Sequence, residues 1–210
     1  MALKFSQIHG QPGVLGELSR SFQAGSVVHA FLIHGDEGCG KKTLAQTMSM
    51  ALHCTGEGEK PCLECGPCRR MLMGVHPDHI EVASDSSVIS VKMVRDLIDR
   101  LTEKPYEGGW RTVIIHNAEK MNEAAQNALL KTLEEPPAYV IFILATTEAH
   151  KIPITILSRC QRYNFKRITI DTIADRIREL TGIEKVPKED KAIRYIAKTA
   201  DGSMRDALSL

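Results

Sequence analysis

The sequence predicts an α/β fold in which helices cover both faces of a parallel sheet. Strand-length apolar runs alternate along the chain with segments of helical periodicity, and this alternation is typical of a parallel sheet. Asn122 is suited to cap one of the helices, and Pro136-Pro137 ends it. The expected strands span residues 31–34, 79–83, 112–115, 139–145 and 162–166, and the expected helices between them include 91–102 and 123–135.

The chain after residue 166 predicts a small helical domain. Helical patterns span residues 171–180 and 190–200, and a third helix is expected from Ser203, with its apolar periodicity still present at Leu210. We therefore expect an α/β domain over residues 1–166 and a truncated all-α domain over residues 167–210.

A glycine-rich loop follows the first expected strand. It reads Gly35-Asp-Glu-Gly-Cys-Gly-Lys41, and a helical pattern begins at Thr43. Strand, loop and helix in this order are the context of a phosphate-binding loop, because backbone N–H groups and the helix N-terminus attract phosphate oxygens. Lys41 is placed to reach the outer phosphates of a nucleotide. The alternative is that Gly35, Gly38 and Gly40 only form a tight turn.

The residues that would handle Mg²⁺ and water have changed. Lys42 stands where a Ser or Thr hydroxyl would bind the metal, and Thr43 is turned by roughly 100° around the helix from that position. His116 and Asn117 follow the strand whose end carries Asp and Glu in a phosphate-loop ATPase. Imidazole is a poor Mg²⁺ ligand and Asn cannot accept a proton. These changes predict a chain that does not hydrolyse ATP, and Glu119 is expected to be a solvated carboxylate.

Four of the six cysteines lie within fifteen residues. Cys54, Cys62, Cys65 and Cys68 are spaced C-x₇-C-x₂-C-x₂-C, with turn-forming Gly and Pro residues among them. This spacing predicts a structural zinc site with four thiolate ligands in an insert over residues 54–68, and free thiols in a loop are the alternative. Nothing at the N-terminus resembles a targeting peptide, so a reducing cytoplasm without disulfides is expected.

Three longer stretches resemble a known family. The segments Asn127-Ala-Leu-Leu-Lys-Thr-Leu-Glu-Glu-Pro-Pro137 and Leu157-Ser-Arg-Cys160 are similar to segments of bacterial clamp-loader subunits, and Phe5-Ser-Gln-Ile-His-Gly-Gln11 is similar to their start. The chain thus resembles the delta-prime and gamma/tau subunits of the DNA polymerase III clamp loader. This resemblance implies an AAA+ fold with a zinc-bearing insert and a helical lid, and places residues 5–11 on the adenine side of the pocket. The collar domain of the family is expected to be absent, so we expect a fragment or an unusually short chain.

The subunit type is interpreted from the changed metal positions. Gly40-Lys-Lys-Thr-Leu44 and Val75-His-Pro-Asp78 resemble delta-prime subunits, whereas Leu144-Ala-Thr-Thr-Glu148 and Gly202-Ser-Met-Arg-Asp-Ala-Leu208 resemble gamma/tau subunits. We give the lost metal ligands more weight and predict a delta-prime-like part of the polymerase holoenzyme with no ATPase or polymerase activity of its own. An active gamma/tau-type ATPase is the alternative, and a stand-alone zinc-dependent nucleic-acid-binding protein is a remote one.

The resemblance also implies roles for three residues. In the family, the arginine at the position of Arg159 reaches the γ-phosphate held by the adjacent subunit, a task that suits a charged, bidentate guanidinium. Thr146 and Arg205 match positions that sense nucleotide, although Thr146 is equally suited to cap backbone. The implied partners are gamma/tau and delta subunits and, through them, the sliding clamp and primed DNA. Binding of ATP and Mg²⁺ by the chain itself is expected to be weak or absent.

The composition argues against two other classes of function. The chain has 210 residues, of which 27 are basic and 26 acidic, and few are aromatic, so neither a basic surface nor a base-stacking platform is indicated. The longest apolar run, over residues 139–145, is far shorter than the roughly 20 residues of a membrane helix. We expect a cytoplasmic protein with no membrane partner.

Overall fold

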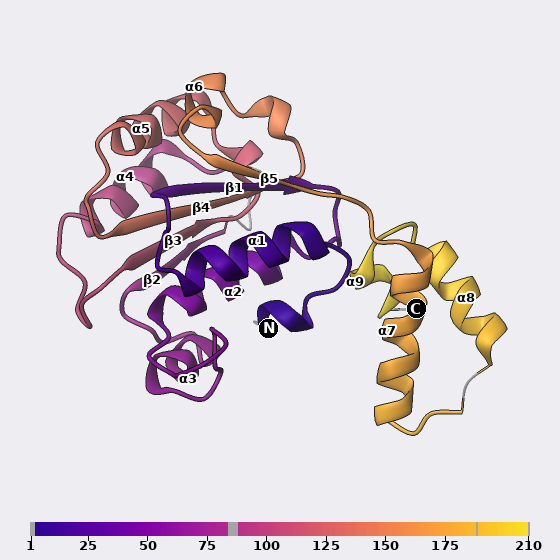
Figure 1. The fold of residues 1–210 in the computed structure, drawn as a ribbon. Coiled ribbons are helices and arrows are strands. Elements are labelled where there is room, and N and C mark those ends of the chain that lie inside the picture. The colour runs from indigo at the N-terminus through magenta and orange to yellow at the C-terminus, as the bar shows by residue number, and fades with distance from the viewer. Residues whose placement is uncertain (1–2, 84–87, 188, 210) are drawn as a thin grey trace.

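The computed structural model describes residues 3–83, 88–187 and 189–209. Within these residues lies a five-stranded parallel sheet with the strand order β2-β3-β4-β1-β5 (Figure 1). Each strand begins and ends within one residue of its predicted bounds, and the α/β fold class is confirmed. The strands are β1 (Ala30–Gly35), β2 (His79–Val82), β3 (Arg111–Ile115), β4 (Val140–Thr146) and β5 (Gln161–Phe165).

Helices cover both faces of this sheet (Figure 1). The side chains of Phe31 and Ile33 pack against one group of helices, and that of Leu32 packs against the other, because successive residues of a strand point to opposite faces. One face carries α1 (Pro12–Gln23) and α2 (Lys41–His53), and the other carries α4 (Val91–Arg100), α5 (Glu123–Glu134) and α6 (Ile154–Leu157).

In the described part of the chain, no helix combines the length and apolar character needed to cross a membrane.

The helix ends follow local sequence signals in some places and not in others. The side chain of Asn122 accepts a hydrogen bond from the N–H of Ala125 at 2.8 Å, so the predicted cap of α5 is confirmed. Helix α1 was not predicted, because Gly13 and Gly16 lower its helix propensity. The remaining short helices are η1 (Phe5–Gln7), α3 (Gly66–Leu72), η2 (Ala118–Lys120) and η3 (Ala149–Lys151).

A helical unit follows β5 and lies to one side of the sheet (Figure 1). It consists of α7 (Ile170–Ile183), α8 (Asp190–Thr199) and α9 (Met204–Ala207), which enclose an apolar cluster of their own. Leu210, to which the third helix was expected to run, lies outside the described residues. We propose the boundary between the two domains at residues 166 and 167, where β5 has ended.

This helical unit contacts the glycine-rich loop directly. The N–H of Met204 donates to the carbonyl of Gly38 at 3.1 Å, and Arg205 forms an ion pair with Glu37 at 2.9 Å. A Cβ atom added to Gly38 would lie 1.8 Å from Oγ of Ser203, and the backbone of Gly38 is left-handed with φ +74°. A glycine is therefore required at position 38 for two reasons: the backbone there is left-handed, and Ser203, the N-cap residue of α9, approaches it closely.

Replacing Gly38 with Ala should lower the midpoint of thermal unfolding more than replacing Gly25 with Ala. Gly25 has a similar φ of +68°, but nothing lies within 4 Å of its added Cβ, so this control isolates backbone strain. That strain costs about 1–2 kcal/mol at either position, and the contact with Ser203 adds to it only at Gly38. Calorimetry of both variants measures the difference. Equal shifts would contradict a tight contact between loop and α9.

Candidate functional site

A pocket of about 770 Å³ opens between the glycine-rich loop and the C-terminal helices. It lies at the carboxyl ends of the central strands, where open α/β sheets bind ligands. The N-terminal segment also reaches it, since Gln7, Ile8 and His9 are among its walls, whereas Phe5 is buried in the core. Six residues predicted for a nucleotide site line the pocket: Gly38, Gly40, Lys41, Lys42, Thr43 and Arg205.

The loop curls around the ammonium group of Lys41. The Nζ atom donates to the carbonyl oxygens of Gly35 at 2.7 Å and Asp36 at 2.6 Å. Burial lowers the pKa of Lys41, and the carboxylates around it, Glu119, Glu37 and Asp36, oppose this effect. Gly35 itself does not line the pocket, and a Cβ added to it would lie 2.2 Å from the carbonyl oxygen of Phe165. The lysine and the N-terminus of α2 thus face one pocket.

Lys42 and Thr43 line the same pocket as Lys41. Lys42 is exposed, and among the described residues its ammonium group forms no hydrogen bond or ion pair. Thr43 is half-buried and lies at the pocket wall, and the expectation that its hydroxyl turns away from the phosphates stays a prediction. The loop therefore presents two consecutive lysines, one held by the loop carbonyls and one open to a ligand.

His116 lies just past the end of β3 and is hydrogen-bonded to a carboxylate from the neighbouring strand. Its Nε2 is 2.8 Å from Oε2 of Glu81. The other oxygen of this carboxylate, Oε1, contacts Nε2 of His79 at 3.1 Å and accepts a hydrogen bond from Nε2 of Gln46 at 2.9 Å. These hydrogen bonds, that of His116 foremost, hold the pKa of Glu81 well below its usual range. Glu81 does not line the pocket, and its carboxylate is directed toward His116 and His79 instead. The sequence contains no signal for this pair, because the two residues come from different strands.

Glu119 differs from the sequence-based expectation. Its carboxylate accepts hydrogen bonds from Oγ1 of Thr146 at 2.6 Å and of Thr147 at 3.3 Å, and it lines the pocket. The prediction of a solvated carboxylate is therefore wrong, because η2 turns Glu119 back toward the end of β4. Thr146 is fully buried and does not line the pocket, and its hydroxyl also accepts from the N–H of Glu148 at 3.1 Å. Thr146 both caps the backbone and orients Glu119.

Arg159 lies outside the pocket, just after α6. Its Nη2 donates to Glu134 at 2.7 Å and its Nη1 donates to the carbonyl of Thr155 at 2.7 Å. The side chain is 35% exposed and is not part of the wall of the chain's own pocket. Its guanidinium is therefore held at the surface, next to the C-terminal end of α5.

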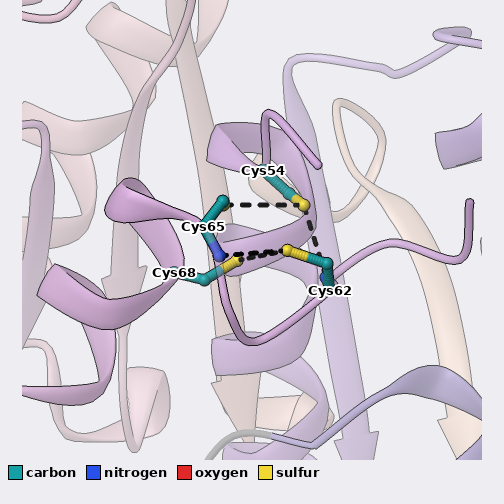
Figure 2. Close-up of side chains that lie close together, drawn as sticks. All are labelled: Cys54, Cys62, Cys65 and Cys68. Carbon is teal, nitrogen blue, oxygen red and sulfur yellow. Dashed lines mark hydrogen bonds between the residues drawn. The ribbon is translucent and has the colours of Figure 1, made fainter. Parts of the chain in front are cut away.

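The four predicted cysteines converge at the end of α2 (Figure 2). The Sγ atoms of Cys54, Cys62, Cys65 and Cys68 all lie within 4.8 Å of one another. Two of the sulfur pairs, Cys62–Cys68 and Cys54–Cys65, are 4.0 Å apart. Bonds of 2.3 Å to a tetrahedral zinc ion place sulfur atoms about 3.8 Å apart. The cluster therefore has the composition and the spacing of a metal site that is closed by protein ligands.

Hydrogen bonds favour the thiolate form of Cys65. Burial raises the pKa of this thiol, but hydrogen bonds from Cys68 and Thr55 outweigh burial and lower the pKa to about 6. Burial and the bond with Cys65 hold the pKa of Cys68 well above its usual range. Because metals bind thiolates, Cys65 is ready to bind at neutral pH, and a metal ion would deprotonate Cys68.

A buried polar network fixes α2 to the sheet between the pocket and the cysteines. Oγ of Ser49 lies 2.5 Å from Oγ1 of Thr112 and 2.9 Å from Nδ1 of His79. His53, the last residue of α2, contacts the same Thr112 hydroxyl at 3.1 Å. Burial foremost, and then the neighbouring His76, lowers the pKa of His53 to about 3, so the imidazole of His53 is uncharged at neutral pH.

The chain matches two family models. One, described as DNA polymerase III, delta subunit, matches residues 10–169, and the other, described as DNA polymerase III clamp loader subunit, ATPase lid domain, matches residues 172–210. DNA polymerase III subunit tau of Bacillus subtilis is 40% identical over 208 residues, which are 99% of this chain and 37% of that protein. Subunit tau of Escherichia coli is 37% identical over 207 residues, which are 98% of this chain and 32% of that protein. The chain spans about a third of the length of these curated relatives.

Solved structures are similar to the chain in fold. The RuvB Holliday junction branch migration motor of Thermotoga maritima has a TM-score of 0.68 at 22% identity, over 95% of this chain and 60% of that chain. A gamma subunit-related protein of DNA polymerase III from the same organism has a TM-score of 0.60 at 22% identity, over 89% of this chain and 58% of that chain. At these identities the likeness shows the fold alone.

The purified chain should contain about one zinc ion per molecule, measured by inductively coupled plasma mass spectrometry, because four converging thiols form one closed tetrahedral site. Replacing Cys65 with Ser should remove most of the zinc, because only three thiolates remain. Replacing Cys160, which lies outside the cluster, should leave the zinc content unchanged. A zinc content near zero in the unmodified chain would contradict a zinc site.

Proposed function

We propose that this chain, which belongs to the DNA polymerase III clamp-loader family, is a delta-prime-like subunit that does not hydrolyse ATP. The observation that carries this proposal is the chemistry of the pocket where Mg²⁺ would bind. Lys42, His116 and Asn117 take the places of the hydroxyl, Asp and Glu that hold the metal and orient the attacking water. The pocket keeps the loop and the lysine that hold phosphates and lacks, at the end of β3, the Asp and Glu that hold the metal and orient water.

The hydrogen bonding of His116 supports the proposal that this site does not bind Mg²⁺. The hydrogen bond to Glu81 directs Nε2 of His116 to a protein carboxylate, and an imidazole is a poor ligand for Mg²⁺. Asn117 is exposed and has a left-handed backbone with φ 49°, which Asn adopts more readily than most residues. Asn117 cannot take a proton from water as Glu does, and Nε2 of His116 is already hydrogen-bonded to Glu81.

We further propose that Arg159 acts on the ATP held by a neighbouring subunit. It is exposed, lies outside its own pocket, and is held at the surface by Glu134 and the carbonyl of Thr155. A guanidinium brought to a γ-phosphate stabilises the charge that develops during phosphoryl transfer. The partners would be gamma/tau and delta subunits and, through them, the sliding clamp and primed DNA, with zinc supporting the insert at residues 54–68.

An active gamma/tau-type ATPase is a second candidate function. It is favoured by Glu119, a carboxylate that lines the pocket and is oriented by Thr146 and Thr147, and by the tau subunits among the relatives. In this case Glu119 would take over the orientation of water. Phosphate release that requires Mg²⁺ and disappears in the Glu119→Gln variant would establish this candidate in place of the first.

Replacing Arg159 with Ala should slow ATP turnover by the assembled loader by about a thousandfold at the neighbouring site, the lower end of the effects known for such arginines. Turnover is measured as phosphate release by the complex with its partner subunits and primed DNA. Arg162→Ala, another exposed arginine a short distance along the chain, is the matched control and should leave turnover unchanged. The proposed role fails if both variants turn over ATP at the rate of the unmodified complex.

The Lys42→Thr variant should release no more phosphate from ATP and Mg²⁺ than the unmodified chain, for which we expect none above background. A hydroxyl at this position supplies one Mg²⁺ ligand, but His116 and Asn117 still lack the carboxylates. A phosphate-release assay on the isolated chain provides the measurement. Hydrolysis restored by this single change would mean that another residue, with Glu119 the first candidate, supplies the missing acid.

A further inference from the structure

Building on the proposed function, we infer that the pocket binds a nucleoside polyphosphate without Mg²⁺, with the ammonium group of Lys42 in the place of the metal ion. The residue at this position of a phosphate loop normally contacts the metal that bridges the outer phosphates. Lys42 is the second residue of α2, lines the pocket and is exposed. A positive charge at this point would meet the same oxygens that Mg²⁺ neutralises elsewhere.

The two consecutive lysines are in different states. Nζ of Lys41 is held by the carbonyl oxygens of Gly35 and Asp36. Lys42 has no hydrogen bond or ion pair within the described part of the chain, so no protein contact has to be broken before it binds phosphate. A lysine ammonium is a compact point charge on a flexible stem, which suits a phosphate group whose position is not fixed by a metal.

The charges around the pocket favour a metal-free ligand. Among the described residues, five basic and two acidic side chains line it, in addition to His9 and His116. A nucleotide without Mg²⁺ carries more negative charge than its Mg²⁺ complex, so the basic excess matches the free nucleotide better. The basic residues are Lys41, Lys42, Lys120, Arg176 and Arg205, and the acidic residues are Glu37 and Glu119.

The residues present do not fit Mg²⁺, which requires oxygen ligands in near-octahedral geometry. Glu37 forms an ion pair with Arg205 at 2.9 Å, and Glu119 accepts hydrogen bonds from two threonines. Glu81 is turned toward His116 and does not line the pocket. The exposed ammonium of Lys42 would also repel a divalent cation placed beside it. The carboxylates of Glu81 and Glu119 are thus hydrogen-bonded to protein groups, and the metal position carries a positive charge of its own.

The test is a titration of the full chain with a fluorescent ATP analogue, once in EDTA and once in excess Mg²⁺, with phosphate release followed in parallel. We expect binding in EDTA to be at least as tight as in Mg²⁺, with no phosphate released, and unlabelled ATP to compete in both conditions. Lys42→Ala should weaken binding in EDTA by about tenfold, because one charge-assisted contact is lost. Lys92→Ala is the matched control, since Lys92 is an exposed lysine at the second position of α4 and lies outside the pocket.

The outcomes separate this inference from the proposed function. Binding that requires Mg²⁺ without phosphate release, or no binding in either condition, would overturn the inference and leave the non-hydrolysing subunit in place. Binding that requires Mg²⁺ and leads to phosphate release would overturn both. If the Lys42→Ala and Lys92→Ala variants bind equally tightly in EDTA, the ammonium group of Lys42 does not take the place of the metal ion, and the inference is overturned. Circular dichroism of each variant shows whether it is folded.

Discussion

The buried hydrogen bond between Ser49 and Thr112 fixes the position of α2, and both candidate sites depend on that helix. Lys41 begins α2 at the pocket, and Cys54 follows its last residue at the cysteine cluster. The two hydroxyl oxygens are 2.5 Å apart and both residues are fully buried. A buried hydroxyl without a partner is costly, so sliding or turning α2 against β3 would break a contact that water cannot replace. The pocket and the cysteine cluster are therefore held at a constant separation along one helix.

The residue at position 116 is coupled through space to Glu81 on the neighbouring strand. An aspartate at position 116, as in a typical ATPase, would bring a second negative charge close to Glu81, whose carboxylate now lies 2.8 Å from His116. Like charges at that range disfavour ionisation of both groups. His116 removes this conflict and gives Glu81 a hydrogen-bond partner instead. The surroundings of position 116 thus suit an imidazole better than a second carboxylate, and a change at Lys42 alone leaves them as they are.

Local signals in the sequence were sufficient for the sheet, the loop and the cysteine cluster, and insufficient for contacts between distant segments. The strands were predicted from apolar runs, and the cysteines from their spacing. The short helix α3 was missed because it lies among Gly, Pro and Cys residues without apolar periodicity. The pairing of Glu81 with His116 and that of Glu119 with Thr146 were missed because the partners lie at the ends of other strands, where no sequence spacing records proximity.

The position of the helical lid on the loop depends more on packing than on charge. The pair Arg205–Glu37 is largely exposed on both sides, with side-chain exposures of 61% and 81%, and such pairs contribute little to stability. The contact between Gly38 and Ser203 and the hydrogen bond from Met204 are short-range and leave no room for a side chain. Since Arg205 has no strong hold on Glu37, phosphate entering the pocket can compete for its guanidinium while the lid keeps its place. On the proposed function, binding of an anion and closure of the lid would therefore be separable, as expected of a subunit that holds its shape while its neighbours turn over ATP.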